Sequence, residues 1–331
     1  MAYSLPRLDG KRCLITGGLG FIGSNLAHSL VAIGAEVSIA DACIDPYGWN
    51  FANIREIKDR VSFTKADIRD EKAMAAAVKG QDFIFNCAAQ VSHIDSMTDP
   101  FLDVDINCRG NLVLLEACRR HADKAKIVYA GTRGQMGSLH YSPADEEHPD
   151  NPTDIYGANK WAAEKYHLVY NSAYGIRATS LRINNTYGER NQMRHAKYGI
   201  MNWFIRLALE GKEIQVFGDG SQTRDYNYIT DVVDAMILAA QSEKSNGKYY
   251  LLGSGNEIKF MDMVKSVIKA AGSGSYKLVP WPADRKAIEI GNFFVTYEKI
   301  RDELGWEPKT SLDEGLRKTI AFYRERKKEY W

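Results

Sequence analysis

Short apolar runs alternate with amphipathic segments along most of the chain. The clearest runs end in glycine, small or acidic residues, and apolar residues at helical spacing follow them. This alternation predicts an α/β protein with a doubly wound parallel sheet. The strands are expected at residues 12–16, 36–41, 61–64, 82–89, 126–130, 177–183 and 249–251, and the main helices at 24–31, 100–121, 155–174 and 231–240.

A glycine-rich turn joins the first predicted strand to the first helix. Gly17, Gly20 and Gly23 are spaced three apart and enclose Phe21 and Ile22. These glycines allow a tight turn, let the backbone approach a pyrophosphate and let the helix pack closely on the strand. The helix N-terminus then offers free N–H groups to the anion. The order strand, turn, helix predicts a Rossmann unit whose turn contacts a dinucleotide.

The ends of the next strands carry further candidate cofactor residues. Asp41 lies about 20 residues after the glycines, where a carboxylate accepts ribose hydroxyls in such units. No arginine follows it closely, so we expect NAD rather than NADP. Asp67 and Ile68 are expected to face the adenine. The small Ala88 and Ala89 would let the cofactor lie close across the edge of the sheet.

Tyr156 and Lys160 lie four residues apart, which places them on one face of a helix. An ammonium beside a phenol favours the phenolate, so we expect the pKa of Tyr156 to fall below its usual value near 10. Such a tyrosine could accept the proton of a sugar hydroxyl. Tyr323 and Lys327 have the same spacing, but their charged surroundings predict a solvated terminal helix.

Composition narrows the class of protein. The 331 residues, 45% hydrophobic and 26% charged, can bury a sizeable core. A net charge of +1 gives no indication of a nucleic-acid or membrane surface. The five cysteines form no CxxC pair and the histidines show no metal-ligand spacing, so we expect no metal. The absence of a signal-type segment or of a transmembrane-length apolar run predicts a cytoplasmic protein.

Together these features resemble the extended short-chain dehydrogenase/reductase family. The resemblance rests on the glycine turn, Asp41, Thr132 after a strand, and the Tyr156–Lys160 pair. It extends from about residue 11 to 325 and is strongest for the nucleotide-sugar epimerase/dehydratase branch, in particular for UDP-sugar 4-epimerases. The downstream segments that carry it are 181–188, 216–220, 223–226 and 304–308.

The resemblance implies a catalytic triad of Thr132, Tyr156 and Lys160. Tyr156 would act as the base, and Lys160 would hold the nicotinamide ribose and lower the pKa of the tyrosine. Thr132 would hydrogen-bond the substrate hydroxyl. Asn107 is implied as a structural residue on the cofactor side.

It also implies a site for a nucleotide-diphosphate sugar. Asn185 would bond a phosphate or sugar oxygen, and Phe217 would lie by the base. Arg224 and Arg285 would clamp the diphosphate, for which guanidinium forks are well suited. Arg133 is expected near the sugar, where it either reads an acidic sugar or packs outward.

The same resemblance divides the chain into two parts. Residues 1–185 and 224–253 would form the NAD-binding Rossmann domain. Residues 186–223 and 254–331 would form a smaller, discontinuous α/β lobe for the nucleotide sugar. The helices at 100–121 and 155–174 would pair across a homodimer.

The residues after Thr132 distinguish the reactions of this branch. A 4,6-dehydratase would carry Asp-Glu there, and a UDP-glucuronate decarboxylase commonly a glutamate at the second position; this chain has Arg133 and Gly134. Epimerisation needs no such acid. We therefore expect C4 epimerisation of a UDP-sugar through a transient 4-keto sugar, with NAD retained between turnovers.

Other reactions remain open. Residues 90–93 are also similar to those of C2-epimerases of CDP-dideoxyhexoses, which is the leading alternative beside a dehydratase or decarboxylase. A non-enzymatic NAD-binding sensor or scaffold is a different class of protein. Such relatives usually lose the tyrosine or the lysine, whereas this chain keeps both.

Overall fold

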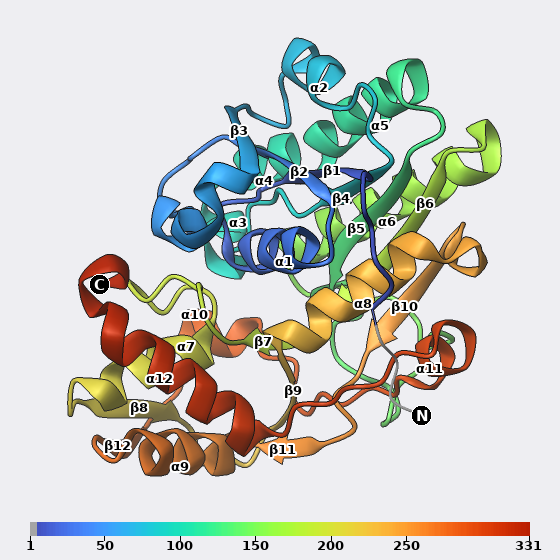
Figure 1. Cartoon of the computed structure of the whole chain (residues 1–331). Helices are drawn as coiled ribbons and strands as arrows, with labels where there is room; N and C mark the ends of the chain where they lie inside the picture. The colour runs from blue at the N-terminus through green and yellow to red at the C-terminus, as the bar shows by residue number, and fades with distance from the viewer. Residues whose placement is uncertain (1–4) are drawn as a thin grey trace.

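A seven-stranded parallel sheet forms the centre of the molecule (Figure 1). The chain builds one half outward from β1 to β3 and then returns to add β4, β5, β6 and β10 on the other side. All neighbouring pairs are parallel, which confirms the predicted doubly wound α/β fold. The strands are β1 Arg12–Thr16, β2 Glu36–Asp41, β3 Val61–Lys65, β4 Phe83–Asn86, β5 Lys126–Thr132, β6 Arg177–Ile183 and β10 Lys248–Leu252.

The computed structural model describes residues 5–331, apart from the side chain of Asp284. Residues 1–4, with which the first predicted domain begins, lie outside it. None of the helices in the described part of the chain is both long and apolar enough to cross a membrane. The helices are α1 Phe21–Ala32, α2 Glu71–Ala77, α3 His93–Thr98, α4 Pro100–Val104, α5 Gly110–His121, α6 Ile155–Tyr174, α7 Ile200–Leu209, α8 Ile229–Gln241, α9 Phe260–Ala271, α10 Ala283–Ala287, α11 Glu298–Leu304 and α12 Leu312–Tyr330. The 3₁₀-helical segments are η1 Phe51–Arg60, η3 Arg133–Gln135 and η4 Glu243–Ser245, and η2 Asp105–Arg109 is π-helical.

Alternate residues of the central strands face two different layers of helices. In β1, Cys13 and Ile15 join the apolar core that contains residues of α1 and α8, whereas Leu14 faces the core with residues of α2 and α5. Successive side chains of a strand point to opposite faces of its sheet. A strand covered on both faces is therefore apolar throughout, which is why the runs in the sequence are continuous.

Two predicted elements have different bounds in the structure. β4 ends at Asn86 rather than Ala89, because its last partner on β1 is Thr16, after which β1 gives way to the glycine turn. The long helix expected at 100–121 is interrupted by the π-helical turn η2. This turn carries the fully buried Asn107, whose amide donates to the Gln90 carbonyl over 3.0 Å.

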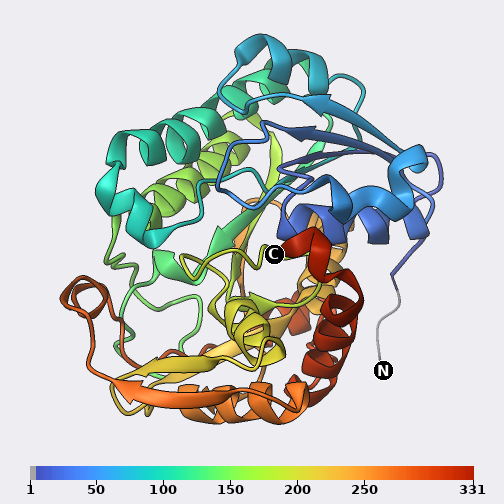
Figure 2. The ribbon, with the colours of Figure 1, turned by 90° about the vertical axis from the view of Figure 1, so that its left-hand side faces the viewer.

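The remaining strands form two smaller sheets. β9 pairs with β7 and β11, and β8 pairs with β12. Figure 2 shows β8 and β12 together with α7, α9 and α12 below the central sheet. These elements make up the smaller α/β part of the architecture, while the residue-by-residue domain division stays a prediction. The strands are β7 Asn185–Tyr187, β8 Glu213–Phe217, β9 Thr223–Tyr228, β11 Glu257–Lys259 and β12 Ser275–Val279.

The terminal helix α12 is not solvated all round, and the prediction for Tyr323 is wrong. Tyr323 is fully buried, and its hydroxyl donates to the Asn191 carbonyl and accepts from the Asn191 N–H, each over 2.8 Å. Lys327 is exposed. The charged run therefore covers the outer face of a helix whose other face packs into the core.

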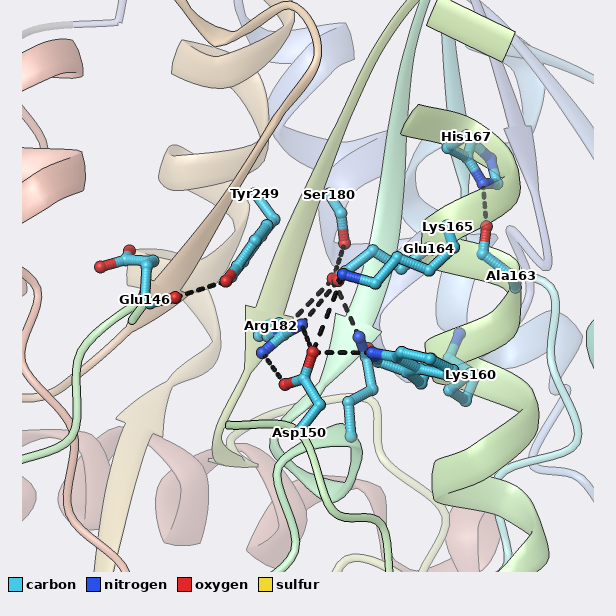
Figure 3. A network of polar contacts seen from close by, with 12 residues as sticks. Glu146, Asp150, Lys160, Ala163, Glu164, Lys165, His167, Ser180, Arg182 and Tyr249 are labelled. Atoms are coloured by element: carbon cyan, nitrogen blue, oxygen red, sulfur yellow. Dashed lines mark hydrogen bonds and ion pairs between the residues drawn. The ribbon is translucent and has the colours of Figure 1, made fainter. Parts of the chain in front are cut away.

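A buried charge network joins β6 to α6 (Figure 3). Arg182 of β6 donates to Glu164 of α6 over 2.7 Å and to Asp150 over 2.6 Å. Burial acts to lower the pKa of Arg182, but the two carboxylates raise it above its ordinary value, so the guanidinium stays charged. Ser180 also donates to Glu164, over 2.9 Å.

The same network holds the end of β5. Gln135, in the turn after β5, donates to Glu164 over 2.8 Å. The side-chain oxygen Oε1 of Gln135 accepts the backbone N–H of Thr132, also over 2.8 Å. Arg182 thus fixes Glu164, Glu164 fixes Gln135, and Gln135 fixes the backbone at Thr132 relative to α6.

Removal of Arg182 should destabilise the protein severely. Arg182→Leu removes the buried cation of Glu164 and leaves only the partly exposed Lys165 at 3.7 Å, and we expect a loss of about 3–5 kcal/mol in unfolding free energy. Arg177→Leu, at the start of the same strand, is the matched control, because the Arg177–Glu243 pair is solvent-exposed and worth about 1 kcal/mol or less. Urea unfolding of both variants measures the difference, and equal losses would contradict the assigned role of the network.

His167 of α6 is buried as a neutral imidazole. Its Nδ1 donates to the Ala163 carbonyl over 2.8 Å (Figure 3), and burial lowers its pKa from 6.5 to about 4. As the pH falls, the unfolded chain takes up this proton first, so stability present at pH 7 is lost between about pH 6.5 and 4.

When the pH is lowered from 7 to 5, the unfolding free energy of the wild type should fall by about 2 kcal/mol more than that of His167→Leu. Urea titrations at the two pH values measure this difference. The exposed His121→Leu is the control and should lose as much as the wild type. A His167→Leu variant that loses as much as the wild type would show that this imidazole does not carry the effect.

Candidate functional site

A cavity of about 280 Å³ lies at the carboxyl ends of the central strands. It is lined from one end to the other by residues that the sequence singled out for the cofactor and for catalysis. These are Gly17, Gly20, Phe21, Ile22, Asp41, Asp67, Ile68, Ala88, Ala89, Thr132 and Tyr156. A single cavity thus brings the glycine turn and the candidate base together. Asn107, Lys160, Arg133, Asn185, Phe217, Arg224 and Arg285 lie outside its lining.

The glycine turn has the shape that a pyrophosphate requires. A Cβ at Gly17 would stand 2.9 Å from the Ala88 backbone, and one at Gly23 only 2.4 Å from the Gly17 carbonyl oxygen. The turn can therefore be this tight only with glycine. Gly20 precedes α1, and no side chain caps the first N–H groups of that helix. The free N–H groups and the positive end of the helix dipole fit a bound phosphate.

Asp41 stands at the far end of the cavity and is held in place by the backbone. The Leu19 N–H donates to one carboxylate oxygen over 3.0 Å and the Cys43 N–H to the other over 2.9 Å. Burial raises the pKa of Asp41, and the two N–H groups oppose this shift. Each oxygen keeps a further lone pair, which suits it to accept ribose hydroxyls. These features fit NAD.

Thr132 and Tyr156 meet through a close contact between β5 and α6. Asp154 caps α6 by accepting the Gly157 N–H over 2.7 Å, which places Tyr156 in the first turn. A Cβ at Gly157 would lie 2.4 Å from the Gly134 carbonyl oxygen, so glycine lets the turn after Thr132 lie directly against the helix. A hydrogen bond between the Thr132 and Tyr156 side chains acts to lower the pKa of the phenol.

The expected lowering of the Tyr156 pKa is wrong for this structure. Burial raises the pKa of Tyr156 above 10, and the negative charges of Asp154 and Asp103 add to the shift. The Lys160 ammonium instead donates to the Ala130 carbonyl over 2.6 Å and lies over the Tyr129 ring. Burial lowers the pKa of Lys160 to about 8. The i, i+4 spacing brings the two residues to one face, but it does not bring the ammonium to the phenol.

Of the candidate substrate residues, Arg133 and Asn185 contact each other. Arg133 donates from Nε to the Asn185 side chain. Arg224 is buried, and it donates to Glu289 and, over 2.8 Å, to the Thr223 carbonyl. Of the remaining two predicted residues, Phe217 packs against Trp281, and Arg285 is half-buried in α10.

Several residues at the site were not among the predicted site residues, although His93 belongs to the segment 90–93 noted in the sequence. His93 lies beside Tyr156, with 4.8 Å between the ring centroids, and its Nδ1 is 2.5 Å from Asp154. Tyr47 and Tyr198 line the cavity from two loops. These residues are brought in by tertiary contacts, so neither spacing nor strand position marks them. Glu289 is likewise identified only by its contact with Arg224.

No group of three or more His, Cys, Asp or Glu side chains within the described residues is arranged to hold a metal ion.

Comparison with known proteins identifies the family. The family model of GDP-mannose 4,6-dehydratase matches residues 14–319. A UDP-glucose 4-epimerase from Mycolicibacterium smegmatis is 33% identical over 317 residues, which cover 95% of this chain and 98% of the relative. A UDP-N-acetyl-alpha-D-glucosaminuronate decarboxylase from Bacillus cytotoxicus is 32% identical over 330 residues, with coverage of 95% and 98%.

A solved structure agrees with the sequence matches. The UDP-glucose 4-epimerase of Thermus thermophilus, in complex with NAD, superposes with a TM-score of 0.85 at 33% identity, covering 95% of this chain and 99% of that one. The predicted family and cofactor are thereby confirmed. The chain belongs to the GDP-mannose 4,6-dehydratase family of extended short-chain dehydrogenases/reductases, the NAD-dependent nucleotide-sugar epimerases and dehydratases, and NAD is its cofactor.

Proposed function

We propose that the protein is a nucleotide-sugar 4-epimerase that acts on a UDP-sugar. The observation that carries the proposal is the pairing of Tyr156 with Thr132 in the cavity, followed in the chain by Arg133 and Gly134. Oxidation of a sugar hydroxyl needs a base and a hydrogen-bonding group, which Tyr156 and Thr132 supply. Elimination of water from the sugar would need acids that these two following positions do not supply. The epimerase relatives support this choice.

The proposed roles are those that the family resemblance implies for each residue. NAD, when bound, supplies the hydride acceptor. Tyr156 removes the proton of the C4 hydroxyl, and Thr132 holds that hydroxyl by a hydrogen bond. Lys160 holds the nicotinamide ribose. Arg224 and Arg285 grip the diphosphate, while Asn185 and Phe217 line the sugar side. The 4-keto sugar turns about its diphosphate link to present its other face.

A dehydratase-type reaction is the second candidate, and the His93–Asp154 pair favours it. His93 could act as an acid or base beside Tyr156, because Asp154 holds Nδ1 and leaves Nε2 available. Its Cε1 lies 3.3 Å from where a Cβ on Gly134 would stand, so the imidazole lies next to the position of the absent acid. Such a reaction brings a solvent proton into the sugar, whereas simple epimerisation does not.

Tyr156→Phe should abolish epimerisation, because it removes the hydroxyl that accepts the substrate proton. We expect the turnover of UDP-glucose or UDP-galactose to fall at least about a hundredfold. Product NMR measures the rate, and the bound NAD and the thermal midpoint show that the variant is folded. Tyr276→Phe, an exposed aromatic on β12, is the matched control. Undiminished turnover in Tyr156→Phe would refute the mechanism.

We also propose a homodimer formed through α4, α5 and α6. Phe101 and Val104 of α4 and Trp161, Val169 and Tyr174 of α6 are large apolar side chains that the single chain leaves exposed. An apolar surface of this kind on neighbouring helices is typical of a subunit interface.

The dimer can be tested by light scattering. The wild type should have the mass of two chains, and Phe101→Glu should shift the protein toward one chain, because it places a charge in the interface. Tyr276→Glu changes an exposed aromatic on β12 and is the control, which should stay dimeric. A wild type with the mass of one chain would contradict the proposal.

The cytoplasm is the proposed compartment. All five cysteines are free thiols, and Cys13, Cys108 and Cys118 are buried in the core. Unpaired cysteines are usual where the environment is reducing.

A further inference from the structure

Arg133 lies beside the reacting groups with a guanidinium that is only partly bonded. It follows Thr132 directly, and its positive charge acts to lower the pKa of Tyr156. Nε donates to the Asn185 side chain, and the guanidinium carbon lies 5.3 Å from the centre of the Phe293 ring. These contacts fix the plane of the Arg133 guanidinium. Its two terminal nitrogens, Nη1 and Nη2, which form the fork, have no hydrogen-bond partner among the described residues.

The carboxylates around Arg133 are already engaged elsewhere. Glu289 pairs with Arg224, and Asp154 pairs with His93 and caps α6. Among the side chains that the structure describes, no carboxylate forms an ion pair with Arg133. Burial and the like charge of Arg224 lower the pKa of Arg133 to about 10, while Glu289 and Asp154 oppose the shift.

A second polar group in this region lacks a partner. The Tyr226 hydroxyl is buried without a hydrogen bond, and the residue is 5% exposed. Tyr226 lies two residues from Arg224 on β9, and it pairs in register with Asn185 of β7, the residue that Arg133 contacts. Two guanidinium groups, one carboxylate and an unpartnered hydroxyl form a cluster with a net positive charge. The buried Tyr226 hydroxyl requires a partner, and the half-buried Arg133 has two nitrogens free to take one.

We propose that the Arg133 fork binds a carboxylate on the sugar, so that the substrate is a nucleotide-linked uronic acid. This rests on the proposed function, because it assumes that the sugar lies against Thr132 and Tyr156. A guanidinium fork matches a carboxylate in a bidentate geometry. The position next to Thr132 places Arg133 on the sugar side, and the proposed function gives Arg224 to the diphosphate. Asn185 is a positioning residue that orients the fork.

The test compares UDP-glucuronate with UDP-glucose in binding and in turnover. Isothermal titration gives the two dissociation constants, and product NMR gives the two kcat/KM values, for the wild type and two variants. The wild type should favour the uronate by about a hundredfold in both measures, as expected when a buried charged group gains or lacks its partner.

Arg133→Gln should reduce this preference to less than about tenfold, because it removes the charge and the fork. Asn185→Asp should do the same while keeping Arg133, because the new carboxylate would occupy the fork in place of the substrate. Bound NAD and the thermal midpoint show that both variants are folded. Arg177→Gln, at the start of β6 and paired with the exposed Glu243, is the charge control and should keep the wild-type preference.

The outcomes separate the two proposals. Tighter binding of the uronate that depends on Arg133, without epimerisation of either sugar, would reject the proposed function and keep the carboxylate site. Epimerisation of both sugars with equal kcat/KM would keep the function and reject the carboxylate site. A uronate preference that Arg133→Gln leaves unchanged, or no binding of UDP-glucuronate, would also reject the site.

Discussion

The buried ion pair between Glu164 and Arg182 is the contact on which the geometry of the site depends. A charge pair in the core gains little net stability, because removing both groups from water costs nearly as much as their attraction returns. What it provides here is position. Glu164 also accepts a hydrogen bond from Gln135, which in turn holds the N–H of Thr132. The strand that ends at Thr132 and the helix that carries Tyr156 are therefore fixed to the same carboxylate.

The parts of the site that depend on local chain geometry could be predicted from the sequence. A strand that ends at Thr16, a glycine turn and a helix form one continuous segment, and Asp41 ends the next strand. Parallel strands bring their carboxyl ends to one edge of the sheet, so Asp41, Ala88 and Thr132 could be expected in one cavity. The positions of these residues depend on local turns and strand order, and not on which side chains meet across the fold.

The parts that depend on tertiary contacts could not be predicted in this way. Tyr156 and Tyr323 begin identical i, i+4 pairs, and both tyrosines are buried, but one lines the cavity and the other bonds a loop of the core. The direction of the Lys160 side chain depends on the Ala130 carbonyl of a neighbouring strand. The pKa of Tyr156 is determined mainly by burial of the side chain, which cannot be predicted from the i, i+4 spacing. The glutamate that holds Arg224 is 65 residues away in the chain.

The chemistry is divided between two neighbouring regions. In the proposed mechanism Tyr156 takes the hydroxyl proton, Thr132 holds that hydroxyl, and NAD would accept the hydride. The groups after Thr132 would then determine what happens to the keto sugar. Those groups are a guanidinium and a glycine, with an imidazole beside them from α3. A guanidinium stays protonated near neutral pH and therefore serves to bind an anion rather than to move a proton. In the proposed function the sugar is therefore held and inverted, without elimination of a group from it.

The most direct test of this mechanism uses the hydrogen at C4 of the substrate. A UDP-sugar labelled with deuterium at C4 is incubated with the enzyme in ordinary water, and the product is examined by NMR and mass spectrometry. The mechanism predicts that the inverted product keeps the deuterium at C4 and gains no solvent hydrogen at the neighbouring carbons. Loss of the label, its transfer to another carbon, or exchange at C3 or C5 would contradict it.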